Sequence, residues 1–67
     1  MTKFERDMEI AKKGGSAYDH MMERRERVIR TITAELRRET RLSWKLGTQE
    51  LLDKYNREYD ELVYAAM

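Results

Sequence analysis

Helix-breaking residues occur at only two places in this chain of 67 residues, at Gly14-Gly15 and at Gly47, and there is no proline. Glycine and proline are the residues that most often end helices, so each of the three intervening segments is free to form one helix. Apolar residues recur every three or four positions in all three segments, which is the spacing of one helix face. The pattern predicts an all-α fold in a single domain, residues 1–67, with helices over 2–13, 17–46 and 49–66.

The residues at the breaks predict how these helices begin and end. The paired glycines favour a tight reversal after the first helix. Ser16 is expected to cap the second helix, because Ser16 and Asp19 have the spacing of a capping box. Gly47 is expected to reverse the chain again, and Thr48 to cap the third helix. Short connections place consecutive helices antiparallel, so we expect an antiparallel helical hairpin with a short N-terminal helix on one end.

The expected turns also fix which residues should lie opposite one another. A reversal at the second break places Tyr55 near Thr40, and a reversal at the paired glycines places Phe4 near Arg25. The apolar stripe of the long second helix weakens over residues 39–43, where polar side chains fall on it. A buried tyrosine needs a hydrogen-bond partner, so we interpret this polar stretch as the partner of the third helix's tyrosines.

The size of the chain argues that it needs a further source of stability. A domain this small buries only about 60% of its unfolded surface, and with no cysteine and one histidine it has no disulfide and no metal site of its own. The sequence therefore predicts a homodimer that forms a four-helix-like bundle, and a self-contained three-helix monomer is the alternative. The predicted dimer interface consists of Met21, Met22, Arg25, Val28, Ile29 and Ile32.

Arg25 is unusual because it falls in the middle of the apolar stripe. A buried guanidinium without a partner is very costly. We therefore expect Arg25 either to reach water or pair with an acid of a second protomer, or to act as a recognition residue in a cleft.

Charge is unevenly distributed although the net charge is only +1. Residues 23–46 carry eight basic and four acidic residues, a net charge of +4, and residues 48–67 carry two basic and five acidic residues, a net charge of −3. The simplest interpretation is a solvated outer face with ion pairs four residues apart, such as Glu23–Arg27 and Glu26–Arg30. A second interpretation is attraction between the basic second helix and the acidic third helix, within or between protomers. A third is a docking strip for an acidic surface, either a nucleic acid or a protein.

Two aromatic residues, Trp44 and Tyr64, project away from the apolar faces. Exposed tryptophan, tyrosine and arginine dominate the binding energy of many protein interfaces. Covering the turn or the end of the third helix would be their purely structural role. The predicted partner-binding residues are Arg37, Arg41, Trp44, Lys45 and Tyr64.

The sequence contains no pattern that predicts catalysis, and we expect no catalytic residues, no cofactor and no metal. It has no apolar run long enough for a membrane span and no signal peptide at its start, so we expect a cytoplasmic protein without a membrane partner. The function expected is a non-catalytic protein-interaction module that acts as a regulator, inhibitor or adaptor, a type that phages and mobile elements often encode. The alternatives are a nucleic-acid-associated protein using the basic strip Arg37–Lys45, and a structural bundle within a larger assembly.

Overall fold

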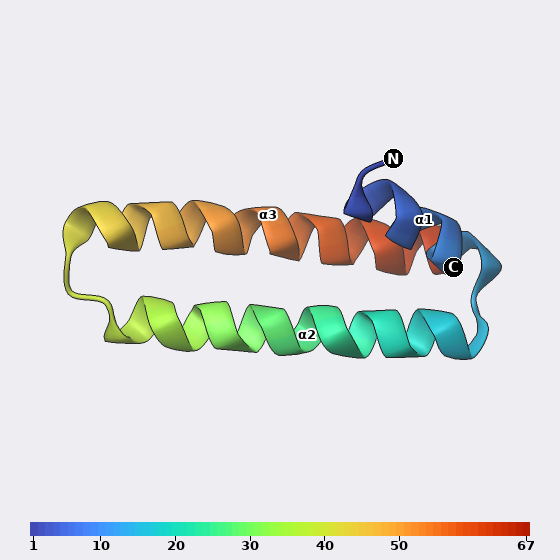
Figure 1. The fold of residues 1–67 in the computed structure, drawn as a ribbon, viewed down its shortest axis with the longest axis horizontal. Coiled ribbons are helices and arrows are strands. Elements are labelled where there is room, and N and C mark those ends of the chain that lie inside the picture. Colours follow the sequence, from blue (N-terminus) through green and yellow to red (C-terminus); the bar gives the residue numbers. More distant parts are fainter.

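The computed structural model describes all 67 residues and contains three α-helices and no strands, which confirms the all-α prediction. The helices are α1 (Lys3–Lys13), α2 (Gly15–Arg38) and α3 (Leu42–Ala66). Helices α2 and α3 lie side by side and run in opposite directions, and α1 packs against the end of this pair that also holds the C-terminus (Figure 1). The molecule measures 41 × 19 × 19 Å. None of the three helices has a stretch long and apolar enough to cross a bilayer.

The connection between α1 and α2 follows the paired glycines, as the sequence predicts. Gly14 and Gly15 have φ angles of 70° and 78°, a backbone region that other residues rarely adopt. Helix α2 begins at Gly15, with Gly14 as its N-cap and no side-chain cap. The prediction that Ser16 caps α2 is therefore wrong, because Ser16 already lies in the first helical turn. Thr2 instead caps α1, through a capping box with Glu5.

The turn between α2 and α3 lies at residues 39–41, and the prediction that it lies at Gly47 is wrong. Helix α2 ends at Arg38 instead of residue 46, and Gly47 lies inside α3. The flanking residues Glu39 and Arg41 are extended, with ψ angles of 126° and 121°. A glycine inside a helix costs only about 1 kcal/mol relative to alanine, so packing of the surrounding helix is sufficient to retain Gly47 in α3.

Moving the turn changes which residues of α2 and α3 face each other. Tyr55 does not lie near Thr40 as predicted, but lines a cavity together with Arg25 and Val28. The polar residues at 39–43 are not the predicted hydrogen-bond partners of the tyrosines. They lie at the end of α2 and the beginning of α3. The weakening of the apolar stripe was thus the sequence signal of the true turn.

The hydrophobic core lies where all three helices meet. Its buried members are Ala11 of α1, Met21 and Met22 of α2 and Leu62 of α3, and Phe4 is among the half-buried residues that pack around them. The Arg25 guanidinium carbon lies 5.9 Å from the centre of the Phe4 ring, which confirms the predicted proximity of these two residues. Because α1 covers the methionines, the core is closed at this end within one chain.

The other end of the α2–α3 pair has no third helix over it. Helix α1 is only 11 residues long and α3 has 25, or about 16 Å against about 37 Å at 1.5 Å per residue. We call the part of the pair beyond the N-terminal end of α1, residues 28–38 and 42–55, the open half. Its exposed apolar residues are Val28, Leu42, Trp44, Leu46 and Leu51.

Candidate functional site

Arg25 lies at the point where the three helices join and is only 4% exposed. Its Nε donates a hydrogen bond of 2.8 Å to Oδ2 of Asp7 in α1, and its Nη2 lies 2.7 Å from the same oxygen. Its Nη1 donates a 3.1 Å bond to Oε1 of Glu58 in α3. The expectation that Arg25 reaches water or pairs with a second protomer is wrong, because both of its acids belong to its own chain. The sequence could not reveal this pairing, since it depends on the register of α3.

The buried charges in this cluster are fully paired. Asp7 is buried with Arg25, and no buried side-chain nitrogen or oxygen in the molecule lacks a hydrogen-bond partner. Such a network contributes little net stability compared with apolar packing, but removing one member leaves a costly unpaired charge. The cluster therefore fixes the position of α1 on the α2–α3 pair.

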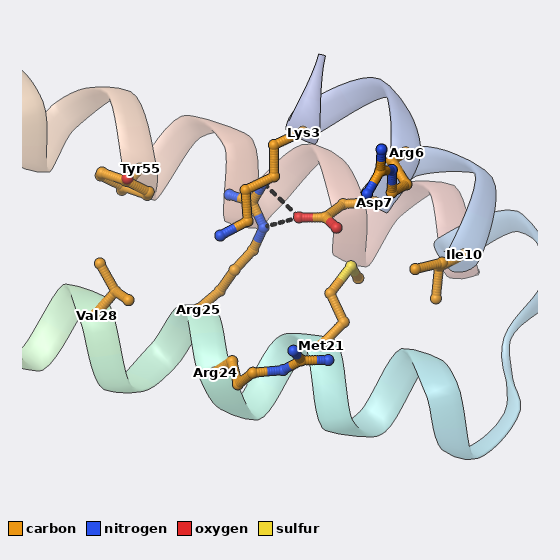
Figure 2. A pocket seen from close by; sticks show the side chains of 9 residues that line it. All are labelled: Lys3, Arg6, Asp7, Ile10, Met21, Arg24, Arg25, Val28 and Tyr55. Carbon is orange, nitrogen blue, oxygen red and sulfur yellow. Dashed lines mark hydrogen bonds and ion pairs between the residues drawn. The ribbon is translucent and has the colours of Figure 1, made fainter. Parts of the chain in front are cut away.

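A partly enclosed cavity of about 530 Å³ lies beside Arg25, between α1 and α2 (Figure 2). Val28 and Tyr55 lie across from each other at the side of this cavity that opens toward the open half. Three cations from α1 and α2 complete its lining, and all three are exposed and make no ion pair. These cations are Lys3, Arg6 and Arg24. The cavity thus combines apolar walls with a positively charged border.

A second cluster forms at the turn, where Arg41 lies between Glu39 and Trp44. The Arg41 Nε and Nη2 donate to the Glu39 carboxylate at 3.1 and 3.3 Å, and the Arg41 backbone N–H donates to it at 2.9 Å. The guanidinium carbon lies 4.4 Å from the centre of the Trp44 ring, within range of a cation–π interaction. Trp44 is nevertheless 60% exposed. The indole therefore contacts the guanidinium without being buried.

The same contacts change the acidity of both charged groups. Hydrogen bonds from the Arg41 side chain, and then from its backbone N–H, lower the pKa of the Glu39 carboxyl. The side-chain hydrogen bonds to Glu39 raise the pKa of Arg41. Glu39 therefore stays ionised to lower pH than an ordinary glutamate, which preserves the arrangement around Trp44.

A shallow groove of about 390 Å³ runs along α3 beside Trp44, with Leu51 at its far end and Gly47 between them. No atom lies within 4 Å of the position that a Cβ of Gly47 would occupy. Gly47 thus leaves space between two large apolar side chains, where the sequence had indicated a turn. Leu51 was missed as a site residue because the predicted helix placed it in the core; its spacing of seven residues from Trp44 was the available signal.

The five predicted partner-binding residues do not form one surface. Arg41 and Trp44 are in contact, whereas Lys45 is exposed and projects about 100° around α3 from Trp44. Arg37 is exposed in the last turn of α2. Tyr64 is 81% exposed but lies twenty residues along α3 from Trp44, which corresponds to about 30 Å.

The predicted dimer-interface residues also separate into two groups. Met21, Met22, Arg25 and Ile32 are buried within the single chain. Val28 is 39% exposed and Ile29 is half-buried. Only the last two residues therefore have surface to offer to a second copy.

Three of the six arginines of α2 are in ion pairs. Glu23–Arg27 and Glu26–Arg30 pair at 3.3 and 2.8 Å, four residues apart, which confirms the expected pairs on the outer face. The strip Arg37–Lys45 does not follow one helix as expected, because the turn divides it between α2 and α3. No three histidine, aspartate or glutamate side chains lie close enough together to hold a metal ion.

Comparison with protein-family models, with curated proteins and with solved structures gave no match to this chain.

Proposed function

We propose that this chain is a non-catalytic protein-interaction module that regulates, inhibits or adapts another protein by binding it. The contact is made by a turn surface that consists of Glu39, Arg41, Trp44 and Leu51, with Gly47 between the two large apolar residues. The observation that supports the proposal is the arrangement of Trp44, whose indole stacks against the Arg41 guanidinium while most of it remains exposed.

This arrangement favours binding because it offers apolar surface for burial at a low entropic cost. Covering the exposed part of a tryptophan removes on the order of 100 Å² of apolar surface from water, worth about 2–3 kcal/mol. Side chains that are already ordered lose little conformational freedom when a partner binds. Arg41 is ordered by Glu39 in this way, so the turn surface offers a tryptophan and an arginine at a low entropic cost.

Affinity capture from the source cells tests the proposal, using the wild type, Trp44→Ala and Leu42→Ala. Leu42 is exposed and lies two residues before Trp44 in the same helix, so its side chain projects to the opposite side of α3. We expect Trp44→Ala to lose the partner that the wild type and Leu42→Ala retain. Capture of the same partner by all three chains would contradict the proposal.

Nucleic acid is a less favoured ligand because the turn divides the basic strip Arg37–Lys45 between two helices and several of the arginines are already paired. Arg27 and Arg30 pair with glutamates of α2, and Arg41 pairs with Glu39. An electrophoretic shift assay separates the two functions, since nucleic-acid binding weakens steeply with salt. Retardation at low salt that disappears at moderate salt would favour the nucleic-acid function.

Self-association as a homodimer, extending the antiparallel helical pair to a four-helix-like bundle, is a second candidate. The supporting observation is the exposure of Val28 and Leu51, which both lie in the open half. Sedimentation equilibrium tests it directly, because the chain has a mass of 8.1 kDa. A dimer at micromolar concentration would favour this candidate, and a monomer would leave the open half available to another protein.

A further inference from the structure

We propose that the open half binds an acidic amphipathic helix of the partner. This helix lies in line with α1 in the groove between α2 and α3. This inference rests on the proposed function and specifies the chemistry of the partner. The groove already accepts one helix, because α1 packs against both α2 and α3 (Figure 1).

One row of residues on α3 runs from beneath α1 into the open half. Trp44, Leu51, Glu58 and Ala65 are spaced seven residues apart, a spacing that drifts only about 20° around a helix. Ala65 packs against the core, and Glu58 bonds to Arg25. Leu51 is 44% exposed, and Trp44 is more exposed still. The row is therefore covered where α1 packs on it and exposed beyond the N-terminal end of α1.

A matching row lies on α2. Met21, Val28 and Glu35 are also seven residues apart; Met21 is buried, whereas Val28 and Glu35 are exposed. Tyr55 of α3 lies opposite Val28 where α1 stops (Figure 2). The fourteen residues of α3 in the open half, 42–55, give the groove a length of about 21 Å, or about four helical turns. The occupant is therefore a helix of about 14 residues with apolar residues at i, i+3, i+7 and i+10.

The charges around the groove define the rest of the occupant. Lys3, Arg6 and Arg24 border the cavity at the inner end of the groove and make no ion pair. Glu35 is the only acid in the two rows that is free of an ion pair. An excess of free cations favours carboxylates on the partner.

The same charges disfavour a second copy of this chain on the open half. An antiparallel second copy would bring the end of its α2, with the exposed cations Arg37 and Arg38, toward Lys3 and Arg24. Like charges that meet in an interface cost affinity. A partner rich in aspartate and glutamate avoids this repulsion.

Two synthetic 14-residue peptides test the proposal. Both carry leucine at the four apolar positions, and the other positions are mainly glutamate in one peptide and mainly lysine in the other. Trp44 is the only tryptophan of the chain, so its emission reports binding at the open half. We expect the glutamate peptide to shift this emission to shorter wavelength and to bind at least about tenfold more tightly than the lysine peptide.

Charge reversals locate the effect. Arg24→Glu should weaken binding of the glutamate peptide about tenfold. Arg57→Glu is the matched control, because Arg57 is an exposed and unpaired cation on α3 that does not border the cavity. Equal binding of the two peptides, no change in Trp44 emission, or equal effects of the two reversals would overturn the proposal. A dimer whose Trp44 is already shielded without peptide would also overturn it, in favour of the second copy.

Failure of the acidic-helix proposal can be distinguished from failure of the proposed protein-binding function. If partner capture depends on Trp44 but is unchanged by Arg24→Glu, the proposed protein-binding function is supported and the proposal of an acidic helix is contradicted. Capture that is unchanged by Trp44→Ala removes the protein-binding function of the turn surface.

Discussion

Nε and Nη2 of Arg25 lie 2.8 and 2.7 Å from one carboxylate oxygen of Asp7, which joins the second helix to the first inside the molecule. Glu58 completes the connection to the third helix. This cluster is the one place where a single residue touches polar groups of all three helices. It fixes where α1 lies along the α2–α3 pair and, as a result, where the open half begins.

Removal of Asp7 should destabilise the fold strongly. Asp7→Ala leaves the buried Arg25 with Glu58 alone, and we expect the free energy of unfolding to fall by about 2–4 kcal/mol. Asp60→Ala is the control, because Asp60 is exposed and makes no ion pair, and we expect a change below about 0.5 kcal/mol. Urea denaturation followed by circular dichroism measures both values. Similar losses for the two variants would show that the Arg25 cluster is not formed.

Alanine substitutions at the three glycines should have opposite effects on stability. Gly14→Ala and Gly15→Ala place a side chain at positive φ, and we expect each to cost about 1–2 kcal/mol. Gly47→Ala should stabilise the chain by up to about 1 kcal/mol, since it improves a helix interior and meets no atom. Thermal unfolding measures all three. A destabilised Gly47→Ala variant would argue for a turn at that residue.

The arrangement around Trp44 should depend on pH in the acidic range. The lowered pKa of Glu39 means that its ionised form is favoured by the native contacts. These contacts are therefore complete above the ordinary glutamate pKa of about 4.3, and they are lost as the pH falls through the lower native value. Trp44 emission, followed from pH 7 to pH 2, should show this transition. Glu39→Gln should abolish it, and persistence of the transition in that variant would assign it to another group.

Truncation of leucines at the two ends of α3 should separate the closed core from the open half. Leu62 is fully buried, so Leu62→Ala should cost about 2–5 kcal/mol of stability. Leu51→Ala should cost less than about 1.5 kcal/mol, because Leu51 is largely exposed and leaves no enclosed cavity. Denaturant titration gives both numbers. A loss at Leu51 as large as that at Leu62 would mean that the open half is packed against something in solution, and the mass of the particle would then identify a second copy.

The sequence predicts the first helix and its connection well because the paired glycines have a backbone conformation that few other residues adopt. It does not predict the second turn, since Glu39, Thr40 and Arg41 are ordinary helix-compatible residues. The weakened apolar stripe was the only signal of the turn. The extended conformation of Glu39 and Arg41 is supported by a contact between side chain and backbone, in which the Glu39 carboxylate accepts the Arg41 N–H. Gly47 was the misleading signal, because a helix interior tolerates a single glycine at a cost of only about 1 kcal/mol.

The candidate site was predicted only in part for the same reason. The exposure of Trp44 and its nearness to Arg41 follow from their local spacing, and both are observed. The grouping of Tyr64 with Trp44 assumed a surface that the length of α3 does not allow. The partners of Arg25 depend on the register between helices, which changed when the turn moved from Gly47 to residues 39–41.

The C-terminus lies beside α1, at the end of the molecule away from the turn that carries Trp44 (Figure 1), and Met67 is exposed. A fluorescent protein, a bead linker or a second module fused at the C-terminus therefore projects away from the indole, whereas the N-terminus borders the open half (Figure 1). Immobilisation through the C-terminus would leave the tryptophan accessible, which makes this end the suitable one for attaching the chain to a surface.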